Sequence, residues 1–176
     1  AIDLRLIAPS APDEQGSKVN KVINNILRIY KESDEWKGTQ LIFCDLYQSP
    51  DPTKIGSSDQ MLDLNGFFEN DKNISRFNLY VDIKKKLIAN GIPESEIAII
   101  TDYPSNKRET LYEKVNAGQI RILIGGTEKM GVGVNVQERA YALHHIDAPA
   151  RPMDIEQRNG RIIRQGNLHA QWEKPI

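Results

Sequence analysis

Four short apolar segments, separated by longer segments of helical periodicity, constrain the fold of this chain most strongly. The apolar segments are residues 40–44, 97–100, 120–124 and 140–146. Short apolar runs of this kind are typical of strands that are buried on both faces. Strands that alternate with helices are joined by right-handed crossovers. The pattern therefore predicts an α/β fold with a mainly parallel sheet and helices on both faces.

Three helices are predicted before and between these strands, at residues 17–30, 77–91 and 105–118. Apolar side chains recur there at intervals of three and four, which indicates helices with one buried face. Ser17 and Ser105 stand where a side-chain oxygen can accept a hydrogen bond from the first turn, so both are predicted N-caps.

Length and charge limit the possible functions. The length of 176 residues predicts a single domain, residues 1–176, with a long loop or insertion at about residues 45–75. The net charge of the chain is −1. A chain with almost no net charge has no overall field that attracts nucleic acid, so an anion site must be a local cluster. The single cysteine, Cys44, lies in an apolar run and predicts a buried, reduced thiol in a cytoplasmic protein. We also expect the chain to be a fragment of a larger protein.

A glycine-rich segment, residues 125–137, follows the third predicted strand. In open α/β sheets, ligands bind at loops that follow the carboxyl ends of strands. Gly131 and Gly133 suggest a dinucleotide-binding loop, but Val136 stands where the third glycine is needed. An ATP-binding phosphate loop needs a lysine and then a serine or threonine after its second glycine, whereas Thr127 and Lys129 stand here in the wrong order. A Rossmann-type dinucleotide enzyme therefore stays a less favoured alternative.

Three arginines recur every third residue after the fourth strand, in the segment EQRNGRIIRQGN, residues 156–167. Pro152 suits the first turn of a helix there, at about residues 152–161. Arginines at this spacing share a broad helix face, which is either solvated or built to bind phosphate. Gly160 costs about 1 kcal/mol inside a helix. The helix therefore ends at Gly160, or another group approaches it closely.

Five segments together resemble the second motor lobe of superfamily 2 helicases, most closely that of Swi/Snf-type translocases. They read, in chain order, IFCDL, TDYPSNKRETL, GGTEKMGVGVNVQ, IDAP and EQRNGRIIRQGN. The amino-acid sequences of these segments are most similar to the helicase part of large phage- and plasmid-type helicase–DNA methyltransferase proteins. The resemblance implies a three-layer RecA-like domain. It also implies ATP and Mg²⁺, bound mainly by a first lobe that this chain does not contain.

The resemblance assigns roles to particular residues. Arg161 and Arg164 match the arginines that contact the γ-phosphate, and are the predicted catalytic residues. The predicted nucleotide-side residues are Gln157, Gly133 and Asn135. The predicted DNA contacts are Thr127, Asp102 and Arg108 by resemblance, together with Lys107 and Lys129, which lie in loops at the expected ligand edge. Two residues depart from the Swi/Snf pattern: Tyr103 replaces a glycine, and Gly160 replaces an aspartate.

The expected function is that of an ATP-dependent DNA helicase or translocase lobe, inactive on its own. Its expected partners are a first RecA-like lobe, DNA that is double-stranded, and a methyltransferase domain in the same polypeptide. The expected setting is the cytoplasm, in a bacterial, phage or plasmid context. The alternative from another class is a silent helicase-like lobe that serves for binding or scaffolding. Intact Arg161 and Arg164 argue against it.

Three other charged or polar features have simpler interpretations. Arg158 is predicted to be a surface or lobe-contact residue rather than a phosphate ligand. The histidines at 144–145, at a strand end, are predicted to pack in the core or at a sheet edge rather than to bind metal, because too few further ligands lie nearby. The acidic pair at 34–35 is predicted to be surface charge.

Overall fold

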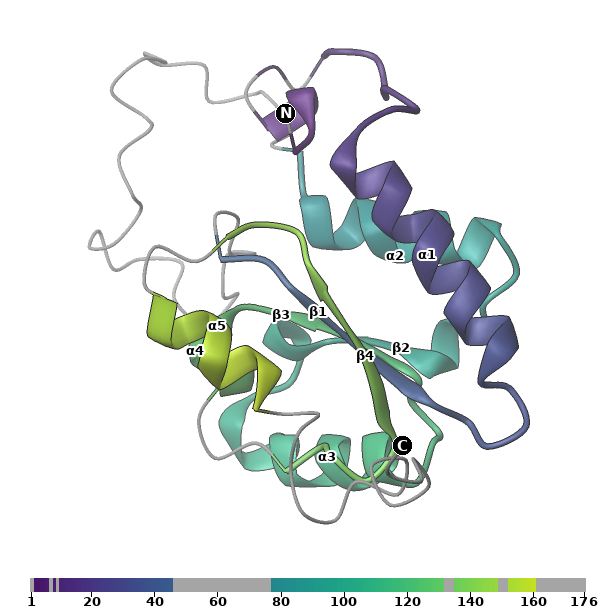
Figure 1. Ribbon diagram of the computed structural model, residues 1–176, viewed down its shortest axis with the longest axis vertical. Coiled ribbons are helices and arrows are strands. Elements are labelled where there is room, and N and C mark those ends of the chain that lie inside the picture. The colour runs from purple at the N-terminus through teal and green to yellow at the C-terminus, as the bar shows by residue number, and fades with distance from the viewer. Residues whose placement is uncertain are drawn as a thin grey trace, which may run out of the picture.

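A parallel β-sheet forms the centre of the protein (Figure 1). The computed structural model describes residues 2–6, 8, 10–45, 77–131, 135–148 and 152–160. Within them the sheet has four strands, in the order β2-β3-β1-β4, and all pairings are parallel. The strands are β1 (Thr39–Phe43), β2 (Ile97–Ile99), β3 (Ile122–Gly125) and β4 (Ala140–His145). The prediction of a parallel α/β sheet is therefore confirmed.

Helices cover both faces of this sheet, as predicted. On one face lie α1 (Lys18–Glu32) and α2 (Leu79–Ala89), and on the other lies α3 (Arg108–Asn116) (Figure 1). The strand order explains the two faces. The connection from β1 to β2 runs past β3, whereas the connection from β2 to β3 runs back. Right-handed crossovers in opposite directions place their helices on opposite faces.

The remaining elements are short. They are the 3-10 turns η1 (Leu4–Leu6), η4 (Glu94–Glu96), η5 (Ile100–Asp102) and η6 (Ser105–Lys107), and the helices α4 (Thr127–Gly131) and α5 (Pro152–Asn159). The helix α4 lies within a segment predicted only as a glycine-rich bend. Among the described residues, no helix is long and apolar enough to cross a membrane.

Two apolar clusters fill the space between the sheet and its helices. Successive residues of β1 point to opposite faces. Ile42 packs in the cluster beneath α1 and α2, and Leu41 and Phe43 pack in the cluster that faces α3. Cys44 lies in the first cluster as a buried free thiol, as predicted. Every residue of β1 is buried, because strands flank it on both sides.

One predicted helix cap is confirmed and one is wrong. The Ser17 side chain accepts a hydrogen bond from the Asn20 amide at the start of α1. Ser105 instead begins the turn η6, and α3 starts three residues later without a side-chain cap. Proline before the turn favours this result, because Pro104 fixes an extended conformation ahead of Ser105 and the turn forms immediately after it.

A buried arginine joins α1 to the amino end of the sheet. The Arg121 side chain is fully buried and donates hydrogen bonds to the Tyr30 and Gly38 carbonyls and to the Ser33 hydroxyl. It also pairs with Asp34 at 2.7 Å. The Asp34 side chain is 59% exposed, so the prediction of surface charge holds, but this carboxylate also pairs with a core cation.

His144 packs in the core, as predicted for the histidine pair. Its Nε2 lies 2.8 Å from Gln40 Oε1, and Gln40 Nε2 donates to the Ile26 carbonyl. Because Gln40 Oε1 can only accept, His144 Nε2 must donate the proton. Burial lowers the pKa of His144 to about 4, so the ring is neutral at neutral pH and carries its proton on Nε2.

This buried histidine predicts an acid-sensitive stability. The folded-state pKa lies below the usual value of 6.5, so the neutral ring favours folding above pH 6.5, and this contribution is lost as the pH falls toward 4. The expected loss is roughly 3 kcal/mol of unfolding free energy at about 1.4 kcal/mol per pKa unit. Urea unfolding at several pH values should show it. His144→Gln should flatten the dependence between pH 6.5 and 4, and an unchanged slope would contradict the assignment.

Candidate functional site

The carboxyl end of the sheet holds a cluster of charged side chains from four elements. Asp45 follows β1, Thr127 begins α4 after β3, Asp147 follows β4, and Arg158 lies in the last turn of α5. The strands β3, β1 and β4 are neighbours, so their following loops converge at one edge. The helices α4 and α5 lie side by side there (Figure 1).

Arg158 is the centre of this cluster. Its Nε donates to Thr127 Oγ1 at 2.6 Å. Its Nη2 donates to Asp45 Oδ2 at 2.5 Å and to Asp147 Oδ1 at 3.2 Å. Its Nη1 donates to the Asp147 carbonyl at 3.1 Å and lies 3.2 Å from His145 Nδ1. All three guanidinium nitrogens therefore have partners.

The prediction that Arg158 lies on the surface is wrong, because its side chain is fully buried. The physical reason is the pair of carboxylates around it, since a buried carboxylate requires a cation or several donors. The sequence contained one signal for this site. Asp45 and Asp147 each follow an apolar strand directly, and neighbouring parallel strands bring such residues together.

Asp45 also holds the start of α4. Its Oδ1 accepts from the Thr127 amide and its Oδ2 from the Thr127 hydroxyl, both at 2.6 Å. The Asp45 amide in turn donates to Asp147 Oδ2. Burial by itself would raise the pKa of Asp45, but the hydrogen bonds from Thr127 and Arg158 outweigh it and keep this pKa below its usual value. The carboxylate is therefore ionised at neutral pH.

His145 completes the cluster as a neutral ring. Arginine nitrogens only donate, so His145 Nδ1 accepts from Arg158, and Nε2 carries the proton toward Asn159 Oδ1 at 3.2 Å. Burial and then the Arg158 charge lower the pKa of His145. The ring also stacks on Phe43. His144 and His145 thus have separate partners, and the described residues include no group of three side chains suited to a metal ion.

Thr127, a predicted DNA contact, has both of its donors engaged. Its amide and hydroxyl hydrogens point to Asp45, and its hydroxyl oxygen accepts from Arg158. The residue is also 7% exposed. Phosphate oxygens only accept hydrogen bonds, so a phosphate contact here would require Asp45 to release Thr127. The structure therefore places Thr127 inside the buried cluster.

The other predicted DNA contacts lie on neighbouring loops. Asp102 and Lys107 are exposed after β2, and half-buried Arg108 donates to the Tyr103 carbonyl. Lys129 lies on α4 and lines a small cavity together with Thr101. The loops after β2 and β3 therefore meet, which brings Lys129 close to the segment that contains Asp102.

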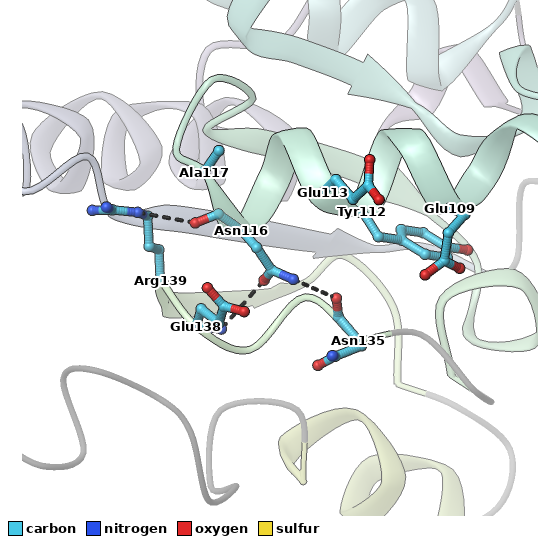
Figure 2. Close-up of a pocket in the computed structure, with 8 residues that line it drawn as sticks. All are labelled: Glu109, Tyr112, Glu113, Asn116, Ala117, Asn135, Glu138 and Arg139. Carbon is cyan, nitrogen blue, oxygen red and sulfur yellow. Dashed lines mark hydrogen bonds between the residues drawn. The ribbon is translucent and has the colours of Figure 1, made fainter.

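Asn135 lies in an open groove of about 480 Å³ beside α3. Figure 2 shows how the Asn116 side chain fixes this segment. Its Nδ2 donates to the Asn135 backbone carbonyl at 2.8 Å, and its Oδ1 accepts from the Glu138 backbone amide. Glu109, Glu113 and Glu138 line the same groove. Carboxylates repel phosphate, and Arg139, which also lines the groove, already donates to the Asn116 and Trp36 carbonyls. The predicted nucleotide contact of Asn135 therefore gains no support from these surroundings and stays a prediction.

The predicted nucleotide-side residues are only partly described. Gln157 lies half-buried on α5, next to Arg158. Gly133, Arg161 and Arg164 lie outside the described residues. Gly160 is described and answers the question that its sequence position raised: the helix ends at Asn159. A Cβ at Gly160 would lie 3.2 Å from the Glu156 carbonyl oxygen, which is a tight contact.

The parallel sheet, its covering helices and the polar cluster at its carboxyl edge define an α/β lobe of the RecA-like class. Residues 21–166 match the model of the family described as Helicase conserved C-terminal domain, and the chain belongs to this family. No curated protein matches the chain. The predicted helicase lobe is thereby confirmed, and the dinucleotide enzyme is disfavoured. Helicase lobes of this family generally act with ATP, Mg²⁺, nucleic acid and a second lobe.

Proposed function

We propose that this chain is the second motor lobe of an ATP-dependent DNA helicase or translocase of the Swi/Snf type. In the complete protein it supplies Arg161 and Arg164 to ATP that a first lobe binds. The DNA is proposed to be double-stranded, and the setting to be a bacterial, phage or plasmid protein that also contains a methyltransferase domain. The family match supports the motor lobe. The motif sequences support the finer assignments, namely the two arginines, the double-stranded DNA and the setting.

The observation that carries the proposal is the attachment of α5 at the carboxyl edge of the sheet. Open α/β sheets bind ligands at this edge. Arg158 ties α5 to three loops there, Gln157 precedes it, and Arg161 and Arg164 follow within six residues. This attachment supports the proposal, because α5 directly precedes the arginine segment in the sequence and lies at the edge where a nucleotide on a facing lobe would lie.

The arginines fit the chemistry of phosphoryl transfer. Charge spreads over the equatorial oxygens of the transferring phosphoryl group, and fixed guanidinium groups stabilise it. The rest of the site is proposed to lie on the first lobe. Asp45 and Asp147 are both paired with Arg158, so neither carboxylate is available for Mg²⁺. The sequence also lacks a phosphate loop, which agrees with ATP and Mg²⁺ bound mainly by the first lobe.

The proposed DNA contacts are Lys107 and Lys129, with Asp102 and Arg108 beside them. Lys107 ends η6 and Lys129 lies on α4, and both elements follow strands at the carboxyl edge. Because Thr127 has its donors engaged by Asp45, we assign the phosphate contacts chiefly to these lysines.

DNA binding by residues 1–176 tests this assignment. We expect weak, salt-sensitive binding in fluorescence anisotropy with duplex DNA, since phosphate contacts release counterions. Lys107→Gln with Lys129→Gln should reduce the slope of log affinity against log salt by about 2, at roughly one unit for each lost contact. Lys21→Gln with Lys31→Gln, on exposed positions of α1, is the matched control. Tight binding that is insensitive to salt would contradict the proposal.

A further inference from the structure

The hydrogen bonds of Arg158 join the helix α5 to the sheet edge, together with one between Asn159 and His145. Among its eight residues, Arg158 is the buried one. Its apolar residues are turned outward: Met153 is 73% exposed and Ile155 is 38% exposed. Apolar packing therefore contributes little to the position of this helix. The hydrogen bonds of Arg158 determine where α5 lies on the sheet edge.

Arg158 lies at the end of α5 that is nearest in sequence to Arg161. It occupies the last turn of α5, directly before Asn159 and Gly160, where the helix ends. Asn159 is fixed from the same side, because its Oδ1 accepts from His145. Arg161 follows Arg158 by three residues in the sequence. Arg158 therefore holds the end of α5 that precedes the proposed catalytic arginine segment.

Stability alone does not account for this arrangement. A buried ion pair is often no more stabilising than apolar residues of similar volume, because both charges lose their hydration. A guanidinium fork, however, fixes direction as well as distance. Here it holds α5 relative to Asp45, Thr127 and Asp147, each on a separate loop. The helices α4 and α5 are thereby fixed to each other.

We propose that Arg158 is a positioning residue for ATP hydrolysis: its buried fork on Asp45, Thr127 and Asp147 sets the placement of α5, and the contribution of Arg161 and Arg164 to turnover depends on it. The inference rests on the proposed function of those two arginines. Arg158 itself has no contact with nucleotide in this assignment, because every guanidinium nitrogen already has a protein partner.

Arg158→Lys in the complete protein tests the inference. Lysine retains the charge but loses the fork. We expect ATP turnover at saturating ATP and DNA to fall by about 10- to 100-fold, as for small misplacements of a catalytic group. Affinity for ADP–aluminium fluoride, a transition-state analogue, should fall by a similar factor. Affinity for ADP and the amount of nucleotide bound per protein should not change. Arg28→Lys, at an exposed arginine of α1, should leave every value unchanged.

A triple variant separates positioning from an independent role. If Arg158 acts through Arg161 and Arg164, then Arg158→Lys should cost less than about 3-fold in a protein that already carries Arg161→Ala and Arg164→Ala. Losses that multiply would overturn the inference, and so would wild-type turnover in Arg158→Lys. Less nucleotide bound per protein would show a folding defect only, and would equally overturn it. Asp45→Asn, a milder change on the same fork, should give the same pattern at smaller size.

The failure of the proposed function would be recognised separately. Arg164→Ala with wild-type turnover would remove the catalytic assignment of that arginine, whatever Arg158→Lys does. Loss of turnover in Arg164→Ala together with normal turnover in Arg158→Lys would remove only the positioning role.

Discussion

Arg164→Ala in the complete protein is expected to lower DNA-stimulated ATP turnover by about 10³-fold or more, as loss of an arginine finger does elsewhere. The expected reason is electrostatic. The guanidinium would stabilise charge that develops on the γ-phosphate oxygens in the transition state, so its removal should lower kcat more than it raises KM. Steady-state hydrolysis at saturating DNA, with ATP varied, measures both constants.

The control for this change is an arginine outside the site. Arg28 lies exposed on α1 and pairs only with Glu32 of the same helix in the described contacts, so Arg28→Ala should leave turnover unchanged. Circular dichroism of the Arg164→Ala protein should match the wild type. A turnover within a few-fold of the wild type would remove Arg164 from the proposed mechanism.

Arg158→Met is expected to have the largest effect on stability. Methionine fills much of the space but leaves the carboxylates of Asp45 and Asp147 without their cation, and the Asp147 side chain is only 1% exposed. Removing one partner of a buried ion pair costs about 3–5 kcal/mol. For a chain of this length the expected fall in Tm is roughly 6–20 °C. Thermal unfolding of residues 1–176 followed by circular dichroism measures it.

Arg121→Met is the matched comparison, since Arg121 is equally buried at the opposite end of the sheet. Its carboxylate partner, Asp34, is 59% exposed and can be hydrated after the change. The main cost is then that of neutral acceptors left without a donor, about 1–3 kcal/mol for each one that stays buried without another partner, and Ser33 keeps its hydrogen bond to the Ile29 carbonyl. Arg121→Met should therefore destabilise less than Arg158→Met. The reverse order would contradict the view that the loss of stability depends on the burial of the carboxylate left behind rather than on the burial of the arginine removed.

The fold was predictable because its signals are local. Apolar runs and helical periods depend on neighbouring residues, so β1, α1 and α2 appear near their predicted positions. The start of α3 was not predicted, because Ser105 follows a proline whose fixed backbone favours a turn there. Periodicity also missed α4, which is too short to show a repeating pattern.

The candidate site was less predictable because it depends on tertiary contacts. The spacing of Arg158, Arg161 and Arg164 suggests three similar residues on one face, yet Arg158 is buried within its own lobe. Its partners Asp45 and Asp147 lie 113 and 11 residues away in sequence. The role of Thr127 was not predicted for the same reason, because its partner Asp45 is also far away in the sequence. The resemblance of Thr127 to a DNA contact gave no sign that Asp45 engages its donors.

ATP hydrolysis by separate and joined lobes tests the central claim most directly. The measurement compares residues 1–176, the first lobe alone, and the complete protein, each with saturating duplex DNA and Mg²⁺. If this lobe contributes arginines to a nucleotide held by the other, only the complete protein should hydrolyse ATP above background. Sustained hydrolysis by residues 1–176 alone, abolished by Arg164→Ala, would show a self-contained ATPase and would contradict the account.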